Sequence, residues 1–173
     1  LFNINDDNDP KTQPLSKAWS VNVDNDNQVW ISFHYGGIRK FNPSVKQITK
    51  YQQDAMGKDL TSLLISKTIN IDNDYLLIAS FNDGLRIMDK KTGEISRFTL
   101  GKNISPNLFV RDLGYFSDGN YWIGTESGLY IYNPASKETT HLYHNINDRF
   151  SLSDNAIYSM YEDREGGIWI GTY

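Results

Sequence analysis

Cysteine is absent from the 173-residue chain, which excludes disulfides and thiolate chemistry but is compatible with either the cytoplasm or the periplasm. Long apolar runs are also lacking, and none approaches the roughly 20 residues of a membrane-spanning helix. We therefore expect no membrane contact by this segment. The first residues, LFNINDDNDP, have neither the basic region nor the apolar core of a secretory signal.

An excess of positive charge is lacking as well. The formal net charge is −4, and charges of both signs are interspersed, without a basic stripe or an acidic block. Nucleic acid is therefore not an expected partner. The length and the composition are those of a globular protein with a sizeable core.

What the sequence does contain is a repeat. Four large apolar residues open runs of similar letters: Trp30 in VWISFHYGGI, Leu77 in LLIASFNDGL, Trp122 in YWIGTESGL and Trp169 in IWIGTY. Their spacings are 47, 45 and 47 residues. The tetrapeptide NIND occurs at 3–6 and again 142 residues later at 145–148, which is three steps of similar length. Periods of this size are typical of solenoids and propellers.

Each repeat shows short apolar alternation interrupted by turn residues, which favours strands over helices. In the best-preserved unit, LFVRDLGY is followed by the turn SDGN, then by YWIGT, the turn ESG, LYIYN and, after a polar hairpin, ETTHLY. Four strands per unit of about 45 residues is the spacing of a β-propeller blade. The sequence therefore predicts an all-β fold, a β-propeller fragment of about three and a half four-stranded antiparallel blades.

We expect this partial β-propeller to occupy residues 1–173. The predicted segments are 1–5 as the end of a preceding blade, 16–51, 65–100 and 108–143 as blades, and 155–173 as the first two strands of a further blade. A blade completed from both chain ends would lack its third strand, and closed rings usually have about 4 to 8 blades. We therefore interpret the chain as an excerpt of a longer propeller protein.

Two sets of residues recur at fixed places in the repeat and are interpreted as structural. The first opens the second strand, with the indoles expected to be buried between blades: Trp30, Leu77, Trp122 and Trp169. The second begins the third strand, where a missing Cβ permits a φ that other residues resist: Gly37, Gly84 and Gly128. Asp24 and Asp163 each precede a tryptophan by six residues and are expected to hold the same turn.

The phrases YEDREGGIWIGT and YWIGTESGLYIYNP, with SLSDNAIYSM before the first, resemble the two-component regulator propeller repeat. The resemblance covers nearly all of the chain and is weakest in the second unit, where Leu77 replaces Trp and Ala79-Ser80 replaces Gly-Thr. It implies a periplasmic sensor region of a hybrid two-component system of the Bacteroides type. Such regions detect oligosaccharides and signal to a histidine kinase, which is not among these residues.

The sequence offers few residue patterns that could form a catalytic or metal-binding site, and we predict no catalytic residue, no metal and no cofactor. His141 and His144 are three apart on or just after a strand, which puts them on opposite faces and disfavours joint metal coordination. The Asp-rich turns at 6–9, 24–28 and 72–75 lack the glycine and the trailing glutamate of a twelve-residue calcium loop. We interpret these turns as structural.

A ligand-binding interpretation has more support. Loops between second and third strands, and between units, lie on one face of a propeller, where ligands dock. The candidates on these loops are His34, Tyr35, Asn82, Asp83 and Glu126, with Arg149 and Phe150 on the long 144–154 connection. Such aromatic and planar polar groups suit sugars. Arg111 on a predicted innermost strand either points into the central channel or forms a buried ion pair with Asp112, and the pair is the favoured alternative.

The leading hypothesis is therefore a non-enzymatic, oligosaccharide-sensing propeller segment in the periplasm, whose other partners are the remaining blades of the parent chain. A propeller enzyme similar to the streptogramin lyases and a protein-binding scaffold are the alternatives, since one fold hosts unrelated functions. Exposed strand edges can also pair between copies, so a homodimer is a further expectation.

Overall fold

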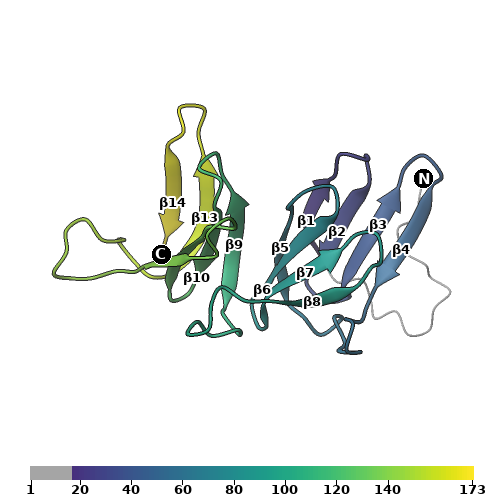
Figure 1. Ribbon diagram of the computed structural model, residues 1–173, viewed down its shortest axis with the longest axis horizontal. Coiled ribbons are helices and arrows are strands. Elements are labelled where there is room, and N and C mark those ends of the chain that lie inside the picture. The colour runs from purple at the N-terminus through teal and green to yellow at the C-terminus, as the bar shows by residue number, and fades with distance from the viewer. Residues whose placement is uncertain (1–16) are drawn as a thin grey trace.

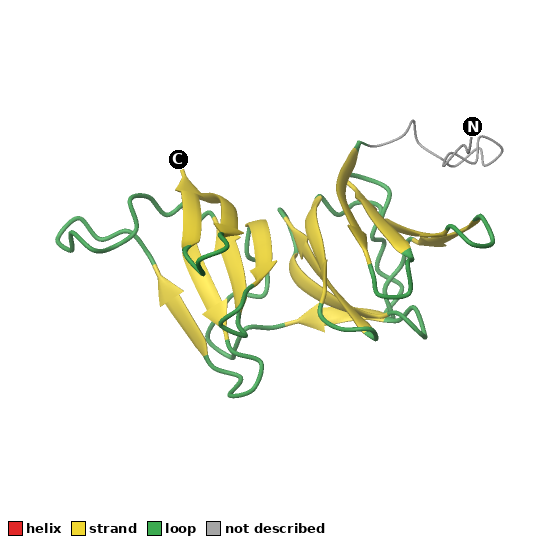
Figure 2. Cartoon of the chain, turned by 90° about the horizontal axis from the view of Figure 1, so that it is seen from above, coloured by secondary structure: helices red, strands yellow, loops and turns green. Residues whose placement is uncertain are grey.

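The computed structural model describes residues 17–173, and these residues form strands, turns and loops (Figure 2). The all-β class predicted from the repeat is confirmed. The predicted strand end at residues 1–5 lies outside the described residues. Nothing in the described part of the chain qualifies as a membrane-spanning helix.

The strands of residues 17–173 form three four-stranded sheets and one two-stranded sheet, all antiparallel and each in sequential order (Figure 1). The first sheet contains β1 (Ala18–Val23), β2 (Val29–Phe33), β3 (Ile38–Asn42) and β4 (Gln47–Tyr51). The second contains β5 (Ile65–Asn70), β6 (Tyr75–Ser80), β7 (Gly84–Asp89) and β8 (Ile95–Phe98). The third contains β9 (Val110–Tyr115), β10 (Tyr121–Thr125), β11 (Gly128–Tyr132) and β12 (Thr139–Leu142). The fourth contains β13 (Ile157–Glu162) and β14 (Ile168–Thr172).

The sheets stand side by side in chain order, and each packs its apolar face on the next (Figure 1). The residue that opens the second strand lies at the following interface each time: Trp30 with Ile65, Leu77 with Val110, and Trp122 with Ile157. Trp30 is 1% exposed, and burying a side chain of this size contributes about 2–3 kcal/mol. The expected burial of Trp169 is not seen, because no sheet of the described residues packs on it and 67% of this residue is exposed.

The first strands of successive sheets are neighbours, which places β1, β5, β9 and β13 around a common centre. Polar side chains join them across the gap. The Asn22 side-chain amide donates to the Thr68 carbonyl at 3.0 Å, and Lys67 Nζ lies 2.5 Å from Asp112 Oδ1. The other Asp112 oxygen accepts the backbone N–H of Met160 at 2.6 Å. Side-by-side inner strands with sheets radiating from them are the arrangement of a β-propeller.

The aspartates before the tryptophans hold the turn between first and second strands, as predicted for Asp24 and Asp163. Three indole N–H groups each donate to such a carboxylate: Trp30 to Asp24 at 2.7 Å, Trp122 to Asp118 at 2.9 Å and Trp169 to Asp163 at 2.6 Å. The remaining carboxylate oxygen of Asp24 accepts the backbone N–H groups of Asp26 and Gln28. The turn and the orientation of the indole are therefore fixed by one side chain.

Glycine is required where the third strand begins. Gly37 and Gly84 have φ values of +74° and +71°, in the left-handed region that favours glycine. A Cβ at Gly37 would lie 2.4 Å from the Tyr51 carbonyl oxygen, and one at Gly84 would lie 2.1 Å from that of Pro106. Gly128 has the same combination, with a φ of +116° and a carbonyl at 2.4 Å. The close approach brings each turn against the end of the fourth strand of its own sheet, or against the connection that follows that strand.

Candidate ligand-binding rim

The loops that carry the predicted ligand-binding residues meet at one end of the sheets. In the first sheet, the Gly36 N–H in the β2–β3 turn donates at 3.1 Å to the carbonyl of Thr61, in the connection to the second sheet. In the third sheet, the Gly128 N–H donates at 2.9 Å to the carbonyl of Asn155, in the connection to the fourth. Turns and connections therefore form a common surface, as the propeller prediction requires.

A β-bulge recurs at this end of every innermost strand. In the first sheet, Ala18 is opposite Phe33 and Ser20 is opposite Ser32, so one residue between them is extra. The same shift occurs in the other three sheets. The extra residues are Trp19, Ser66, Arg111 and Tyr158. Bulges redirect a side chain and are common beside functional sites. Trp19, Arg111 and Tyr158 make contacts at this end of the molecule, whereas the Ser66 hydroxyl is buried and donates to the Val110 carbonyl at 2.8 Å.

A backbone hydrogen bond closes the same end of each sheet. In each sheet, the residue immediately after the second strand donates its backbone N–H to the carbonyl of the residue immediately before the first strand. The four pairs are His34 with Lys17, Phe81 with Leu64, Glu126 with Phe109, and Tyr173 with Ala156. The donor residue lies beside the bulge of its own sheet. Two regular backbone features therefore gather side chains from all four sheets.

We call the resulting surface the rim. The rim consists of Trp19, His34, Tyr35, Phe81, Phe109, Arg111, Glu126, Tyr158 and Tyr173. Its rings form two groups of contacts, one from Tyr35 to Phe109 and one between Tyr158 and Tyr173, and Arg111 lies against a ring of each group. The centroid of Trp19 lies 5.1 Å from that of His34 and 6.0 Å from that of Phe81, and Phe81 lies 5.1 Å from Phe109. Phe109 is 41% exposed and Trp19 is 50% exposed, so the rings remain accessible.

Arg111 and Glu126 are the charged pair within the rim. The Arg111 Nε–H and the Nη2 group both meet the Glu126 Oε1 atom. The Arg111 guanidinium carbon also lies 3.9 Å from the ring centroid of Tyr158 and 5.3 Å from that of Phe109. Contacts of this kind are attractive because the ring face is electronegative. The ion pair therefore stands between aromatic residues of the third and fourth sheets.

Four of the residues predicted to bind ligand lie together in the rim: His34, Tyr35, Arg111 and Glu126. Asn82 and Asp83 lie in the β6–β7 turn, but their polar atoms face the protein. The Asn82 side-chain oxygen accepts the backbone N–H of Leu64 at 3.1 Å, and the side-chain amide donates to the Ser62 carbonyl at 3.4 Å. Asn82 thus fastens the connection between the first two sheets.

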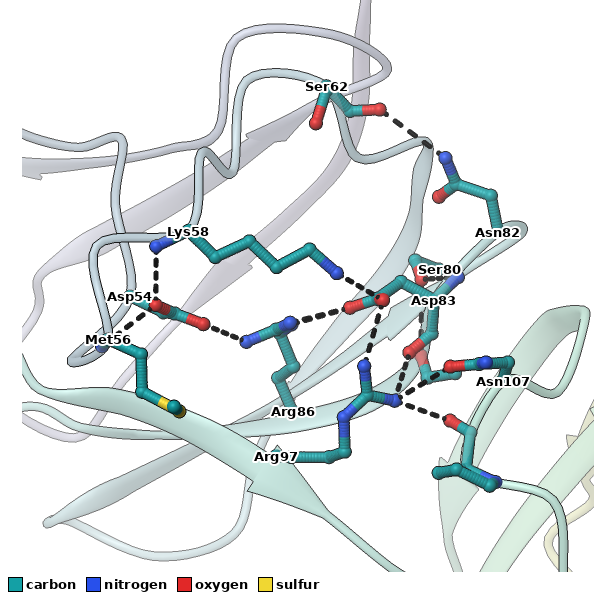
Figure 3. A network of polar contacts seen from close by, with 12 residues as sticks. Asp54, Met56, Lys58, Ser62, Ser80, Asn82, Asp83, Arg86, Arg97 and Asn107 are labelled. Carbon is teal, nitrogen blue, oxygen red and sulfur yellow. Dashed lines mark hydrogen bonds and ion pairs between the residues drawn. The ribbon is translucent and has the colours of Figure 1, made fainter.

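Asp83 belongs to a buried charge network beneath that turn (Figure 3). Its Oδ2 lies 2.7 Å from Arg86 Nη2, and its Oδ1 lies 2.5 Å from Lys58 Nζ and 3.0 Å from Arg97 Nη2. Burial alone would raise the pKa of Asp83, but the hydrogen bonds from Lys58 and Arg86 and the nearby guanidinium charges outweigh it and lower the pKa. Arg86 also binds Asp54 at 2.5 Å. Both oxygens of Asp83 are therefore engaged within the protein.

Arg149 and Phe150 lie on the β12–β13 connection. This connection extends beyond the sheets as a long loop in Figures 1 and 2. The Arg149 guanidinium carbon lies 5.0 Å from the Phe150 ring centroid, and Phe150 is 85% exposed. The structure therefore does not bring Arg149 together with the other predicted ligand-binding residues.

The favoured pairing of Arg111 with Asp112 is wrong. Arg111 is the extra residue of its bulge and reaches Glu126, at the end of the second strand. Asp112 returns to the regular ladder and faces the neighbouring inner strands, where it meets Lys67 and the backbone of Met160. The bulge separates the two side chains, and strand alternation alone does not reveal it.

The other histidines make local contacts. His141 stacks on Tyr130 with centroids 4.1 Å apart and an interplanar angle of 2°, and its Nε2 lies 2.9 Å from the Ser127 carbonyl oxygen. His144 Nδ1 lies 2.7 Å from the carbonyl oxygen of Leu152. Within residues 17–173, no group of three or more histidine, aspartate or glutamate side chains is arranged to hold a metal ion.

Five rim residues were not predicted from the sequence. They are Trp19, Phe81, Phe109, Tyr158 and Tyr173. The signal that identifies most of them is the repeat itself. When the repeats are aligned at the ends of their second strands, Phe81 and Tyr173 occupy the position of His34 and Glu126. When they are aligned on their first strands, Trp19 and Tyr158 occupy the position of Arg111.

The chain resembles known proteins in sequence and in fold. Residues 151–173 match the model of the two-component regulator propeller, which confirms the resemblance seen in the sequence. Histidine kinase P4 of Formosa agariphila is 28% identical over 178 residues, which cover 99% of this chain and 13% of that protein. The chain therefore spans about an eighth of the length of this curated relative.

Two solved structures show the fold. The extracellular domain of the hybrid two-component system BT4673 from B. thetaiotaomicron superposes with a TM-score of 0.74 at 22% identity, over 92% of this chain and 21% of that one. Virginiamycin B lyase from Staphylococcus aureus gives a TM-score of 0.66 at 13% identity, over 91% of this chain and 49% of that one. The partial β-propeller architecture is therefore established, and it is shared by an extracellular domain of a two-component system and by a lyase.

Proposed function

We propose that this chain is part of the periplasmic sensor region of a hybrid two-component system and that its rim binds an oligosaccharide. The regulator-propeller match and the histidine kinase relative support the first part. The rim supports the second. Ligand binding would bias the conformation of the complete propeller, and the kinase that reads this change would lie elsewhere in the protein.

The observation that carries the proposal is the row of aromatic rings at one end of the sheets, in two groups that are bridged by the Arg111–Glu126 ion pair. Aromatic faces are electron-rich and suit the electropositive C–H faces of sugar rings, and planar charged groups bind hydroxyls in pairs. Trp19, Tyr35 and Tyr158 are 50%, 52% and 46% exposed. The rings extend from the first sheet to the fourth, so an extended saccharide fits the rim better than a single sugar.

The same arrangement offers a route from binding to signalling. Rim contacts cross from one sheet to the next, with Trp19 of the first sheet against Phe81 of the second, and Arg111 of the third against Tyr158 of the fourth. A saccharide lying across these residues would contact several sheets at once. Its binding energy would then depend on the relative positions of the sheets, which is the condition for a ligand to shift a conformational equilibrium.

Calorimetric titration of the intact protein that carries this chain, against a panel of hexasaccharides, tests the proposal. We expect saturable heat with at least one saccharide and about tenfold weaker binding for Phe109→Ala, equivalent to about 1.4 kcal/mol. Tyr115→Ala is the matched control, because Tyr115 is 50% exposed at the other end of β9, about 20 Å away along the strand. Heat from no saccharide, or equal losses in both variants, would contradict rim binding. Formation of a new product would instead favour an enzyme.

A further inference from the structure

The ion pair in the rim leaves one donor group and one acceptor atom unused. Both contacts from Arg111 go to Oε1 of Glu126, through Nε and Nη2. Within the described residues, the structure records no protein partner for Arg111 Nη1 or for Glu126 Oε2. The two side chains are 22% and 39% exposed. A donor and an acceptor held in one fixed unit are therefore available to solvent.

The surroundings hold this unit in place. The guanidinium of Arg111 lies against Tyr158 and Phe109, and the Glu126 N–H is bound to the Phe109 carbonyl at 3.2 Å. An arginine fixed by rings and by a carboxylate loses little further entropy when its last donors bind. The pair is thus preorganised before any ligand arrives.

The charges of this unit cancel. Arg111 contributes one positive charge and Glu126 one negative charge. Glu126 is also the more exposed of the two side chains. A ligand carboxylate or sulfate that approached Arg111 Nη1 would therefore meet the Glu126 carboxylate at short range. Like charges close together disfavour binding, and this is a common means of rejecting a wrong ligand.

We infer that the rim selects neutral oligosaccharides by presenting Arg111 and Glu126 as a donor–acceptor pair to two neighbouring sugar hydroxyls, and that Glu126 rejects acidic ones. A hydroxyl oxygen accepts from Arg111 Nη1, and an adjacent hydroxyl donates to Glu126 Oε2. The sugar ring lies against the exposed portions of Phe109 and Tyr158, which are 41% and 46% exposed. This inference rests on the proposed function and adds the charge class of the ligand.

Titration calorimetry on the intact protein tests the inference. The neutral probes are cellohexaose, xylohexaose, maltohexaose and mannohexaose, and the acidic probe is hexagalacturonate. We expect at least one neutral hexasaccharide to bind and hexagalacturonate to bind about tenfold more weakly than it, or not at all. The Glu126→Gln variant should bind the neutral saccharide more weakly and hexagalacturonate more tightly, because the positive charge of Arg111 is then no longer neutralised by a carboxylate. Glu138→Gln, at an exposed position before β12, makes the same change in net charge and should leave both affinities unaltered.

Thermal unfolding of each variant, measured in parallel, separates loss of folding from loss of binding. Tighter binding of hexagalacturonate than of every neutral probe by the unaltered protein would overturn the inference and leave oligosaccharide binding intact. Equal effects of Glu126→Gln and Glu138→Gln would also overturn it, because the rim pair would then not contact the sugar. Failure of all five probes to bind would overturn the proposed function, and the inference with it.

Discussion

Replacing Arg86 with methionine tests the buried network beneath the β6–β7 turn. The Arg86 side chain is 4% exposed and binds Asp54 at 2.5 Å and Asp83 at 2.7 Å, and these carboxylates are 6% and 8% exposed (Figure 3). Methionine keeps most of the length and the apolar stem of arginine but removes the guanidinium. The variant therefore leaves two buried carboxylates without their shared cation.

The expected loss follows from which partners remain. Removing one member of a buried ion pair costs about 3–5 kcal/mol, because the other charge stays buried. Asp83 keeps its contacts with Lys58 and Arg97, whereas Asp54 keeps only backbone hydrogen bonds. We therefore expect a loss near the lower bound, about 3 kcal/mol, equivalent to about 6–12 °C in the unfolding midpoint of a domain of this size.

The control is an ion pair on the surface. Lys91 Nζ lies 2.7 Å from Asp74, with side chains that are 73% and 46% exposed, and pairs of this kind contribute about 0–1 kcal/mol. The assay is urea unfolding followed by tryptophan fluorescence, with Arg86→Met and Lys91→Met compared at neutral pH. If Arg86→Met destabilised the protein no more than Lys91→Met, the argument from burial would be refuted.

The network also predicts the response to acid. For Asp54, burial would raise the pKa, but hydrogen bonds from the Lys58 backbone and the Arg86 side chain lower it below its ordinary value. Its contribution to stability is therefore present above the unfolded pKa of about 4 and is lost as the pH falls through the lowered folded pKa. Without Arg86 the folded pKa of Asp54 rises toward its unfolded value, so the difference in free energy of unfolding between the unaltered protein and Arg86→Met should narrow as the pH falls below about 4. A difference in free energy of unfolding that stayed constant from neutral pH into acid would show that the guanidinium does not hold this carboxylate ionised.

Two further measurements concern the turn glycines and a buried tyrosine. Gly84→Ala should destabilise the protein by more than Gly119→Ala in the same unfolding assay, because both residues have positive φ but only a Cβ at Gly84 meets a backbone carbonyl, that of Pro106 at 2.1 Å. Equal losses of stability in the two variants would mean that the positive φ alone, and not the contact with the Pro106 carbonyl, causes the destabilisation. Burial, with smaller contributions from nearby negative charges, raises the pKa of Tyr121 to about 12, so an ultraviolet titration should find one phenol that ionises well after the exposed ones. The stability due to the neutral phenol is full below about pH 10 and is lost as the pH rises toward 12, and early ionisation of every tyrosine in the folded protein would contradict the burial.

Much of the fold could be predicted from the sequence repeat. The spacing of Trp30, Leu77 and Trp122 predicted equivalent places in successive sheets, and the structure puts all three at the interface with the next sheet. These features follow from local pattern, because apolar alternation and turn residues determine which segments become strands. The exposure of Trp169 differs because no sheet of the described residues packs on that indole.

The candidate site was harder to predict because it depends on register and on distant partners. A single extra residue in the first strand turns Arg111 toward Glu126 and away from the predicted pairing with Asp112. Asp83 is a polar residue in a turn, as ligand-binding residues often are. Its cationic partners lie 25, 3 and 14 residues away in the sequence, on the preceding connection and on the two following strands. Periodicity does not contain that information, since charge pairing is decided only when the sheets pack.

Hydrogen–deuterium exchange with and without a bound neutral hexasaccharide tests most directly whether the rim is the binding surface. The account predicts slower exchange at the backbone N–H groups that close this end of the sheets, namely those of His34, Phe81, Glu126 and Tyr173, with unchanged exchange at the turns held by Asp24 and Asp118 on the opposite side. Protection confined to those opposite turns, or to the β12–β13 connection, would contradict it.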